Sequence, residues 1–426
     1  MRILHTSDWH LGQHFISKSR AAEHQAFIDW LLTQVTTHNI DAVIIAGDVF
    51  DTGTPPSYAR KLYNYFVVEM SKLTCQLVVL GGNHDSVSML DESKGLLAAM
   101  GTYVVPNVQE VTDQQVFVLN NAEGEAGAIL CAIPFIRPRD VVGSQAGASS
   151  TDKQQALGDA IAAHYKTLYD YADAKRAGFK QPLPIVASGH LTAMGVTTSD
   201  SVRDIYIGSL EAFPAKGFPP ADYIALGHIH RPQVVAKSEH IRYCGSPIPL
   251  SFDELGTQKQ VLIAAFSEGK LAKITPLPIP LFQPMQVVRG DLESIQKQLI
   301  QLPTEPAQTD LFGELLGDEV TPAALPIWLS IEVETQDYLN DLQQRIQTMT
   351  ADMNVEVLQL RRARSGKQAQ ITQEAKETLN ELTVGDVFER RLALESFETK
   401  QEQQRLGRIR NTFGEIVESI KLEDAP

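Results

Sequence analysis

Short strings of metal-ligating residue types, spread over the first 230 residues, constrain the fold of this chain more than any other feature. They hold Asp8 and His10 in SDWH, Asp48 in AGDVFD, Asn83, His84 and Asp85 in GGNHD, His190 in SGH, and His228 and His230 in LGHIH. Each string follows an apolar run that predicts a buried strand. Open α/β sheets place their sites at the carboxyl ends of strands, so we expect these side chains to meet at one edge.

The apolar runs alternate with helical patterns. Residues 2–7, 42–46 and 76–80 predict strands, as do two later runs that end at Ser188 and Leu226. Between them, one helical face carries Phe27, Trp30, Leu31 and Val35, and another carries Tyr58, Leu62, Phe66 and Met70. This alternation predicts a layered α/β domain.

The types of the candidate ligands indicate the metal. Carboxylate, amide oxygen and imidazole are present without thiolate, which favours manganese or iron over a structural zinc. Two residues spaced by two point the same way in an extended segment, so Asp8 can aim with His10 and His228 with His230. Seven ligands with one shared carboxylate suit two ions about 3.5–4 Å apart, the spacing at which two metals hold both the attacking and the leaving oxygen of a phosphate ester. The sequence therefore predicts a binuclear hydrolase.

Composition limits the way in which this chain can bind its partners. The 426 residues are 43% apolar, enough for a sizeable core, and carry 37 Lys and Arg against 52 Asp and Glu, a formal net charge of −15. That charge argues against a protein that coats nucleic acid electrostatically, so any nucleic-acid affinity must come from bound metals or from a partner subunit. No apolar run is long enough to cross a bilayer and no signal sequence precedes the first strand, so we expect a cytoplasmic protein. Cys75, Cys131 and Cys244 suit reduced, mostly buried thiols.

Shifts in composition predict three parts, with the boundaries 1–280, 281–365 and 366–426. A proline cluster from Pro276 to Pro284 predicts the first linker. Residues 141–158 are rich in Gly, Ser, Ala and Gln, and predict a mobile surface loop. The second part predicts a small α+β unit interrupted by an acidic surface insertion at 303–325, with Asp291 and Thr335 as helix caps. The third part turns polar and helical, with an apolar stripe formed by Leu406, Ile409, Phe413, Ile416 and Ile420.

The ordered set D-x-H, G-D-x-x-D, G-N-H-D, G-H and G-H-x-H resembles the calcineurin-like metallophosphoesterases. The longer strings HTSDWHLGQ, AGDVFDTG, IPFIRPRD, RDIYIGSLEAFP and RYCGSPIPLSFDE are similar to the bacterial nuclease branch of that family. This resemblance implies that Asp8, His10, Asp48 and His230 bind one ion. It implies that Asp48, Asn83, His190 and His228 bind the other, that His84 acts on the scissile phosphate, and that Asp85 orients His84.

The resemblance also implies an activity and partners. It implies manganese-dependent exonuclease and endonuclease action on double-strand ends and hairpins, with magnesium or iron as possible metals, in DNA repair, recombination and replication. It implies an SMC-like ATPase that binds residues 380–426, a DNA-capping role for the small unit, and a homodimer within a heterotetramer, paired through helices near 57–72 and 86–100. The acidic insertion is longer than this resemblance predicts.

Other interpretations stay open. The same metal site could serve a phosphomonoesterase or nucleotidase, or metals could hold together a scaffold subunit that has no turnover. His5, His24, His38 and His164 fit no ligand string and suit ordinary core or surface positions. His14 and Asp51 lie near the strings, where Asp51 either supports the loop or contacts substrate. Arg137 and Arg139 either bind phosphates or are solvated, and the run of Arg361, Arg362 and Arg364 either meets DNA or borders a helix.

Overall fold

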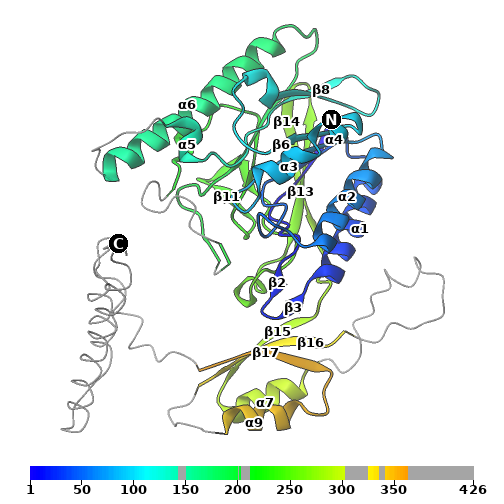
Figure 1. Ribbon diagram of the computed structural model, residues 1–426, viewed down its shortest axis with the longest axis vertical. Helices are drawn as coiled ribbons and strands as arrows, with labels where there is room; N and C mark the ends of the chain where they lie inside the picture. Colours follow the sequence, from blue (N-terminus) through cyan, green and yellow to red (C-terminus); the bar gives the residue numbers. More distant parts are fainter. Residues whose placement is uncertain (143–149, 200, 203–211, 303–324, 335–340, 363–426) are drawn as a thin grey trace, which may run out of the picture. The chain divides into compact units, whose positions relative to one another are not determined.

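A computed structural model describes residues 1–142, 150–199, 201–202, 212–302, 325–334 and 341–362 (Figure 1). The chain divides into two compact units, Met1–Ala363 and Arg364–Pro426. The predicted helical tail, most of the acidic insertion, the Thr335 cap and Arg364 lie outside the described residues. Among the helices of the described part, none is both long and apolar enough to span a bilayer.

The first sheet has six strands in the order β14-β13-β1-β4-β5-β6. Its strands are β1 (Arg2–Thr6), β4 (Ala42–Ala46), β5 (Gln76–Leu80), β6 (Thr102–Val105), β13 (Gln260–Ser267) and β14 (Lys270–Pro278). The first four run parallel, whereas β13 joins β1 antiparallel and β14 joins β13 antiparallel. The outer face is covered by α1 (Ala21–Thr37) and α2 (Ser57–Ser71), as the apolar pattern predicts.

The second sheet also has six strands, in the order β11-β12-β10-β9-β8-β7. Its strands are β7 (Val116–Asn120), β8 (Ala126–Cys131), β9 (Ile185–His190), β10 (Tyr223–Gly227), β11 (Gln233–Val235) and β12 (Ser238–Tyr243). The middle four are parallel and the two outer ones antiparallel. Helix α6 (Ser150–Arg176) packs on its outer face.

An apolar layer between the two sheets makes the domain a four-layered sandwich. Fully buried side chains from the first sheet, such as Ile44 and Val78, meet Leu130, Val186 and Ala225 from the second. Because both faces of each sheet are covered, the parallel strands read as continuous apolar runs rather than alternating ones. The predicted layered α/β fold is confirmed.

Short elements connect these layers. They are the hairpin strands β2 (His14–Phe15) and β3 (Lys18–Ser19), the helices α3 (Val87–Glu92), α4 (Lys94–Ala99) and α5 (Pro138–Val141), and the 3-10 turns η1 (Thr112–Gln115), η2 (Ala215–Gly217) and η3 (Phe252–Glu254). The segment 86–100 thus forms two short helices. Cys131 and Cys244 are buried free thiols and Cys75 is partly buried, as predicted.

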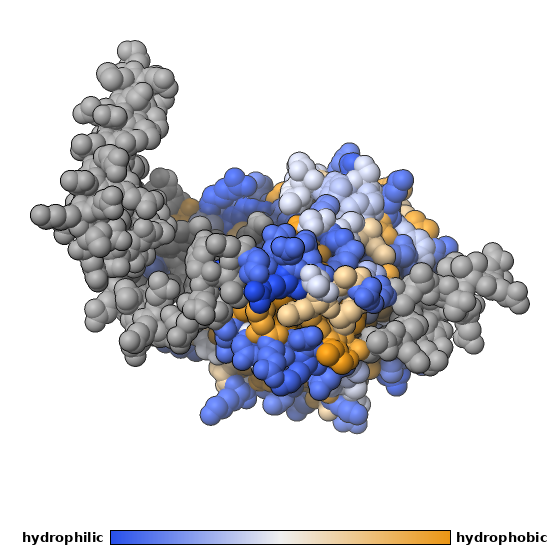
Figure 2. Space-filling view, turned by 90° about the horizontal axis from the view of Figure 1, so that it is seen from below, coloured by the Kyte–Doolittle hydropathy of each residue, from blue (hydrophilic) through white to orange (hydrophobic). Residues whose placement is uncertain are grey.

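The small unit alternates strand and helix: β15 (Met285–Gly290), α7 (Leu292–Ile300), β16 (Ile327–Val333), α9 (Leu342–Thr350) and β17 (Val355–Arg362). The predicted cap is present, because Asp291 Oδ1 accepts the Ser294 N–H at 2.8 Å. We expected an α+β unit, and the pairing is parallel throughout, since each crossover through a helix returns the chain to the same end of the sheet. Figure 2 looks onto this end of the molecule and shows apolar surface between hydrophilic side chains. Ile300 and Leu325 are among the exposed large apolar residues of this unit.

Three local predictions are wrong. The expected loop over 141–158 is helical from Ser150, because Leu157, Ile161 and Tyr165 form a buried stripe that extends α6 into this segment. The proline cluster begins within β14 rather than in a linker, and β14 is an edge strand, which tolerates proline. Arg361 and Arg362 end strand β17 and do not border a helix.

Candidate metal centre

The candidate ligands converge where strands of both sheets end. Asp8 and His10 follow β1, Asp48 follows β4, and Asn83 with His84 follows β5. His190 ends β9, and His228 with His230 follows β10. The candidate ligands of the first and last strings are buried, as are Asp48 and His190, whereas Asn83 and His84 are half-buried. The predicted convergence at one edge is therefore present in the structure.

The backbone at this edge is strained. Asp8, His10, Asp48 and His228 all have positive φ, at 55°, 46°, 51° and 91°. Such conformations cost about 1–3 kcal/mol each for residues other than glycine and persist where the surrounding structure holds them, which is typical of functional sites. The turns after β1, β4 and β10 therefore aim these side chains inward at an energetic cost.

Glycine leaves room for the bridging carboxylate. A Cβ added to Gly82 would lie 2.1 Å from Asp48 Oδ1, and one added to Gly47 would lie 2.2 Å from His190 Nδ1. No side chain fits at those distances. The glycines before Asp48 and Asn83 in the sequence strings are thus needed because the two loops approach each other closely.

Three overlapping groups of ligand atoms, each within 4.8 Å, lie around Asp48. They are Asp8 with His10 and His230, His10 with Asp48 and His84, and Asp48 with His190 and His228. Asp48 Oδ2 lies 3.2 Å from His190 Nε2 and 3.7 Å from His10 Nε2. Asp48 is therefore placed between two clusters, as a shared ligand must be.

The first cluster has its ligand atoms fixed by neighbours. Asp8 Oδ1 accepts the His228 N–H at 2.8 Å, and its Oδ2 accepts the Ser7 hydroxyl at 2.6 Å. His10 Nδ1 is 3.1 Å from Asp51 Oδ1. Its Nε2 is buried without a hydrogen-bond partner among the described residues. A buried imidazole nitrogen without a partner is costly unless a cation or a ligand takes its lone pair.

The second cluster is arranged in the same way. His190 Nδ1 donates to the Ala46 carbonyl at 2.9 Å, which turns its Nε2 toward Asn83 Oδ1 at 2.9 Å. His228 Nδ1 is 3.1 Å from the same amide oxygen. Within the described part of the chain, His228 Nε2 is a second buried nitrogen without a partner. These two nitrogens and the carboxylate, amide and imidazole donors around them fit divalent cations.

Electrostatics at the site favour positive charge. Burial opposes the charged form of His190, but the Asp48 carboxylate beside it raises its pKa to about 9. Burial likewise opposes the ionised form of Asp48, yet His190 and His10 hold its pKa well below the usual value. Burial and the neighbouring His190 depress the pKa of His228. The cluster keeps its carboxylate ionised and one imidazole neutral, which are the forms that bind metals.

His84 lies at this cluster but is held differently from what we expected. Its Nδ1 donates to the Asp51 carbonyl at 2.7 Å, which assigns the other nitrogen, Nε2, to proton exchange. The Asp85 carboxylate accepts three backbone N–H groups, from Gly82, Phe50 and Val49, at 2.8, 2.9 and 3.2 Å. A carboxylate shared among three amides fixes the two loops. The orienting role that we expect for Asp85 would therefore act through the backbone, and not through direct contact with the ring.

The residues near the strings are resolved unevenly. Asp51 contacts His10, so it has the supporting role that we had weighed against substrate contact. His14 is exposed on the hairpin. Arg137 donates to the Asp85 carbonyl at 3.4 Å, whereas the Arg139 side chain is 79% exposed. His5 and His24 are fully buried core residues, as predicted.

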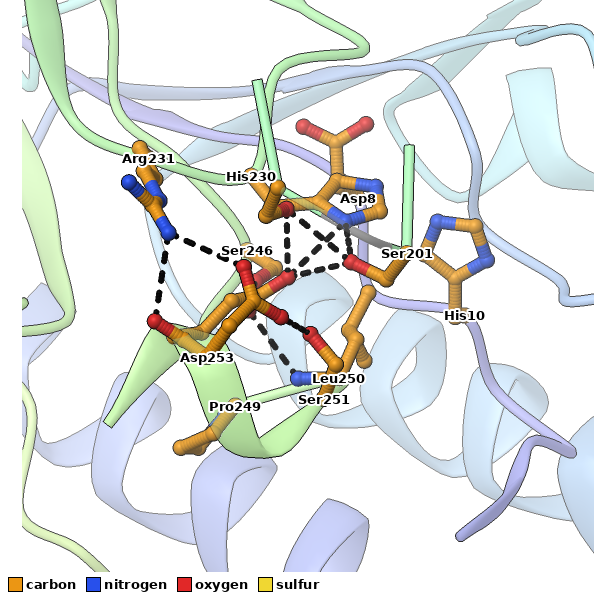
Figure 3. A network of polar contacts seen from close by, with 12 residues as sticks. Asp8, His10, Ser201, His230, Arg231, Ser246, Pro249, Leu250, Ser251 and Asp253 are labelled. Atoms are coloured by element: carbon orange, nitrogen blue, oxygen red, sulfur yellow. Dashed lines mark hydrogen bonds and ion pairs between the residues drawn. The ribbon is translucent and has the colours of Figure 1, made fainter. Parts of the chain in front are cut away.

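Sequence reasoning missed the residues behind His230. Its Nδ1 lies 2.6 Å from Ser201 Oγ and 3.2 Å from Glu254 Oε1, in the polar network of Figure 3. Glu254 is in turn paired with the buried Lys259. A signal was present, since Glu254 ends the string SPIPLSFDE, but no spacing rule links this string to LGHIH.

The sandwich fold and the carboxylate–imidazole cluster define a metal-dependent phosphoesterase. The model of the calcineurin-like phosphoesterases matches residues 1–232, and a model described as the type 5 capsule protein repressor C-terminal domain matches residues 281–396. The fold of this family implies divalent metal ions, which the donor set above fits.

Similar proteins narrow the class. The chain is 53% identical over 404 residues to the SbcD subunit of the nuclease SbcCD of Escherichia coli (strain K12), covering 95% of this chain and 96% of the relative. The corresponding SbcCD nuclease subunit of Rhodobacter capsulatus is 34% identical over 66% of this chain and 70% of its own, and that of Bacillus subtilis 32% over 64% and 68%. The chain belongs to the SbcD family of metal-dependent nuclease subunits.

Proposed function

We propose that this chain is the nuclease subunit of an SbcCD-type complex and hydrolyses DNA phosphodiester bonds at double-strand ends and hairpins. The observation that carries the proposal is the convergence of potential ligands from five strand ends around Asp48, with two buried imidazole nitrogens that have no partner among the described residues. Family membership supports the reaction class.

The ligand assignment follows from the two clusters. Asp8, His10, Asp48 and His230 hold one ion, and Asp48, Asn83, His190 and His228 hold the other. We propose manganese for both, with magnesium or iron as alternatives, because oxygen and imidazole ligands without thiolate suit these metals. When bound, two divalent ions neutralise the phosphate charge and make a water nucleophilic at neutral pH.

The protein's own groups then act around that chemistry. The Asp51 carbonyl holds His84 Nδ1–H, so the Nε2 atom is the one that exchanges a proton with the departing oxygen or stabilises its charge. Asp85 keeps the loops after β4 and β5 together through its three amide contacts. The geometry between these loops is therefore set before substrate arrives, and reacting groups held in place in advance lower the entropic part of the barrier.

The rest of the chain supplies partners. We propose the division 1–280 for the nuclease domain, 281–365 for a DNA-capping domain and 366–426 for the segment that binds an SbcC-type SMC-like ATPase. Two copies would pair within a heterotetramer, in the cytoplasm near the nucleoid. The net charge of −15 supports this arrangement, because the ATPase would provide the DNA backbone contacts that an acidic chain makes poorly.

The test is the variant His84→Gln. We expect it to bind two Mn²⁺ and duplex DNA as the wild type does, while cleavage of an end-labelled duplex falls by about 10²-fold or more, since proton transfer contributes about 10²–10⁴-fold. His14→Gln, an exposed histidine on β2, is the matched control. Wild-type cleavage by His84→Gln would refute the role of His84.

A second arm separates the competing activities. Labelled 3′ and 5′ duplexes and a small phosphate monoester are assayed with manganese or magnesium, with and without the ATPase. Hydrolysis of the monoester without cleavage of DNA would favour a phosphomonoesterase. Two bound ions with no turnover on either substrate would favour a scaffold.

A further inference from the structure

A buried carboxylate lies directly behind one of the candidate metal ligands. Glu254, at the end of η3, has no exposed surface, and its Oε1 lies 3.2 Å from His230 Nδ1. The Ser201 hydroxyl contacts both groups. Figure 3 shows this network on one side of the His230 ring, with Asp8 and His10 beside it. The opposite ring nitrogen, Nε2, is the atom that can join the cluster with Asp8 and His10.

A buried cation holds this carboxylate in place. Lys259 Nζ lies 2.5 Å from Glu254 Oε2 and also donates to the Ser246 hydroxyl at 2.8 Å and to the His230 carbonyl at 3.0 Å. The Leu250 N–H donates to the same carboxylate oxygen at 3.0 Å. Both oxygens of Glu254 are therefore used, one toward the lysine and one toward the histidine.

We propose that Glu254 is a positioning residue for one of the two metal sites, and that Lys259 keeps it in place. A carboxylate at Nδ1 fixes the proton on that nitrogen, turns Nε2 toward the metal and makes the imidazole a stronger donor. This inference rests on the two-metal function proposed above.

The effect should be confined to one ion. His190, in the other cluster, is oriented by the Ala46 carbonyl, and His228 by Asn83, so neither depends on Glu254. Loss of Glu254 should therefore weaken the site that His230 shares with Asp8 and leave the other site near its wild-type affinity.

A purely structural role is the competing explanation, because breaking a buried ion pair is destabilising in itself. Glu254→Gln leaves Lys259 buried without its partner. The double variant Glu254→Gln/Lys259→Met removes both charges, and replacement of a buried pair by neutral side chains is often tolerated. The double variant therefore separates stability from positioning.

The experiment titrates Mn²⁺ into the metal-free full-length chain by calorimetry and records thermal unfolding of the same samples. We expect two sites in the wild type. In the double variant we expect one site about 10- to 100-fold weaker, the range for loss of a residue that supports a metal ligand, and the other within about twofold. Its unfolding temperature should recover toward the wild-type value relative to Glu254→Gln.

Two further variants complete the design. Asp253→Asn changes the preceding residue, whose carboxylate pairs with Arg231 at the surface, and should leave both affinities unchanged. Ser201→Ala keeps the ion pair and should change the affinity less than about threefold, because the Glu254 carboxylate still holds the His230 ring. A loss of about tenfold or more in Ser201→Ala would make the serine, and not Glu254, the anchor of His230.

Several results would overturn the inference. Wild-type affinity at both sites in the double variant would assign Glu254 a structural role only, and equal weakening of both sites would contradict the selective effect. A wild-type protein that binds fewer than two Mn²⁺ would refute the proposed function itself, before any variant is compared.

Discussion

His5 makes the fold sensitive to acid in the strand that leads to the first two candidate ligands. It lies on β1 with no exposed surface, its Nδ1 is 2.9 Å from the Tyr223 hydroxyl and its Nε2 is 3.2 Å from the Leu226 carbonyl. Burial lowers its pKa from 6.5 to about 3, and the Leu226 carbonyl offsets this only in part. The perturbation that we choose is His5→Gln, which keeps a polar side chain but removes the titrating ring.

The sign and size follow from linkage. Because the pKa in the folded state lies below that of the unfolded chain, the unfolded state takes up the proton first as the pH falls. The stability that neutral His5 allows is complete above pH 6.5 and is lost progressively toward pH 3. Between pH 7 and pH 5 the loss from this one group is about 2 kcal/mol, and it reaches about 4 kcal/mol near pH 3.

The assay is urea unfolding of the metal-free chain, followed by circular dichroism at pH 7 and pH 5. We expect His5→Gln to be less stable than the wild type at pH 7 but to lose about 2 kcal/mol less on going to pH 5. His38→Gln, at the partly exposed C-terminal end of α1, is the matched control and should lose as much as the wild type. An equal loss in the wild type and His5→Gln would show that His5 is not the acid-sensitive group.

Three more predictions concern the site. Gly82→Ala should retain its far-ultraviolet spectrum but bind Mn²⁺ at least tenfold more weakly by calorimetry, because the added Cβ would lie 2.1 Å from Asp48 Oδ1; unchanged binding would contradict the close approach of the two loops. Arg137→Met should raise the KM for duplex DNA about tenfold, or about 1.4 kcal/mol, with Arg139→Met within about twofold, because Arg137 contacts the loop that carries the catalytic residues and Arg139 is exposed; equal KM values for both variants would refute this. Removal of metal with a chelator should lower the unfolding temperature, and Mn²⁺ at about 100 times its Kd should restore about 2.7 kcal/mol per site; a calorimetric scan that does not respond to Mn²⁺ would count against both sites.

The strand-end strings were enough to predict the layered fold and the meeting of the ligands. This succeeds because a parallel strand buried on both faces must be apolar along its whole length, and the polar residues that follow it must lie at one edge. Asp8, Asp48 and His190 could therefore be assigned to one site although they are far apart in the chain. Local signals also sufficed for the Asp291 cap, because a cap involves only neighbouring residues.

Composition was a poor guide where tertiary contacts decide the conformation. The chain is helical from Ser150 onward, within the stretch expected to be a loop, because Leu157 and Ile161 are buried against the second sheet. Pro276 lies in a strand because that strand is at the edge of its sheet. Neither outcome is visible in a local window, since both depend on what packs beside the segment.

The sequence by itself determined which chemistry this protein can perform, because ligand type and strand-end position are local properties of the chain. Only the tertiary structure decided how each ligand is held. His10 is fixed by Asp51, His84 by the Asp51 carbonyl, and His230 by Glu254, which is paired with Lys259. These contacts depend on distances between side chains of different loops, and such distances exist only once both sheets have packed together.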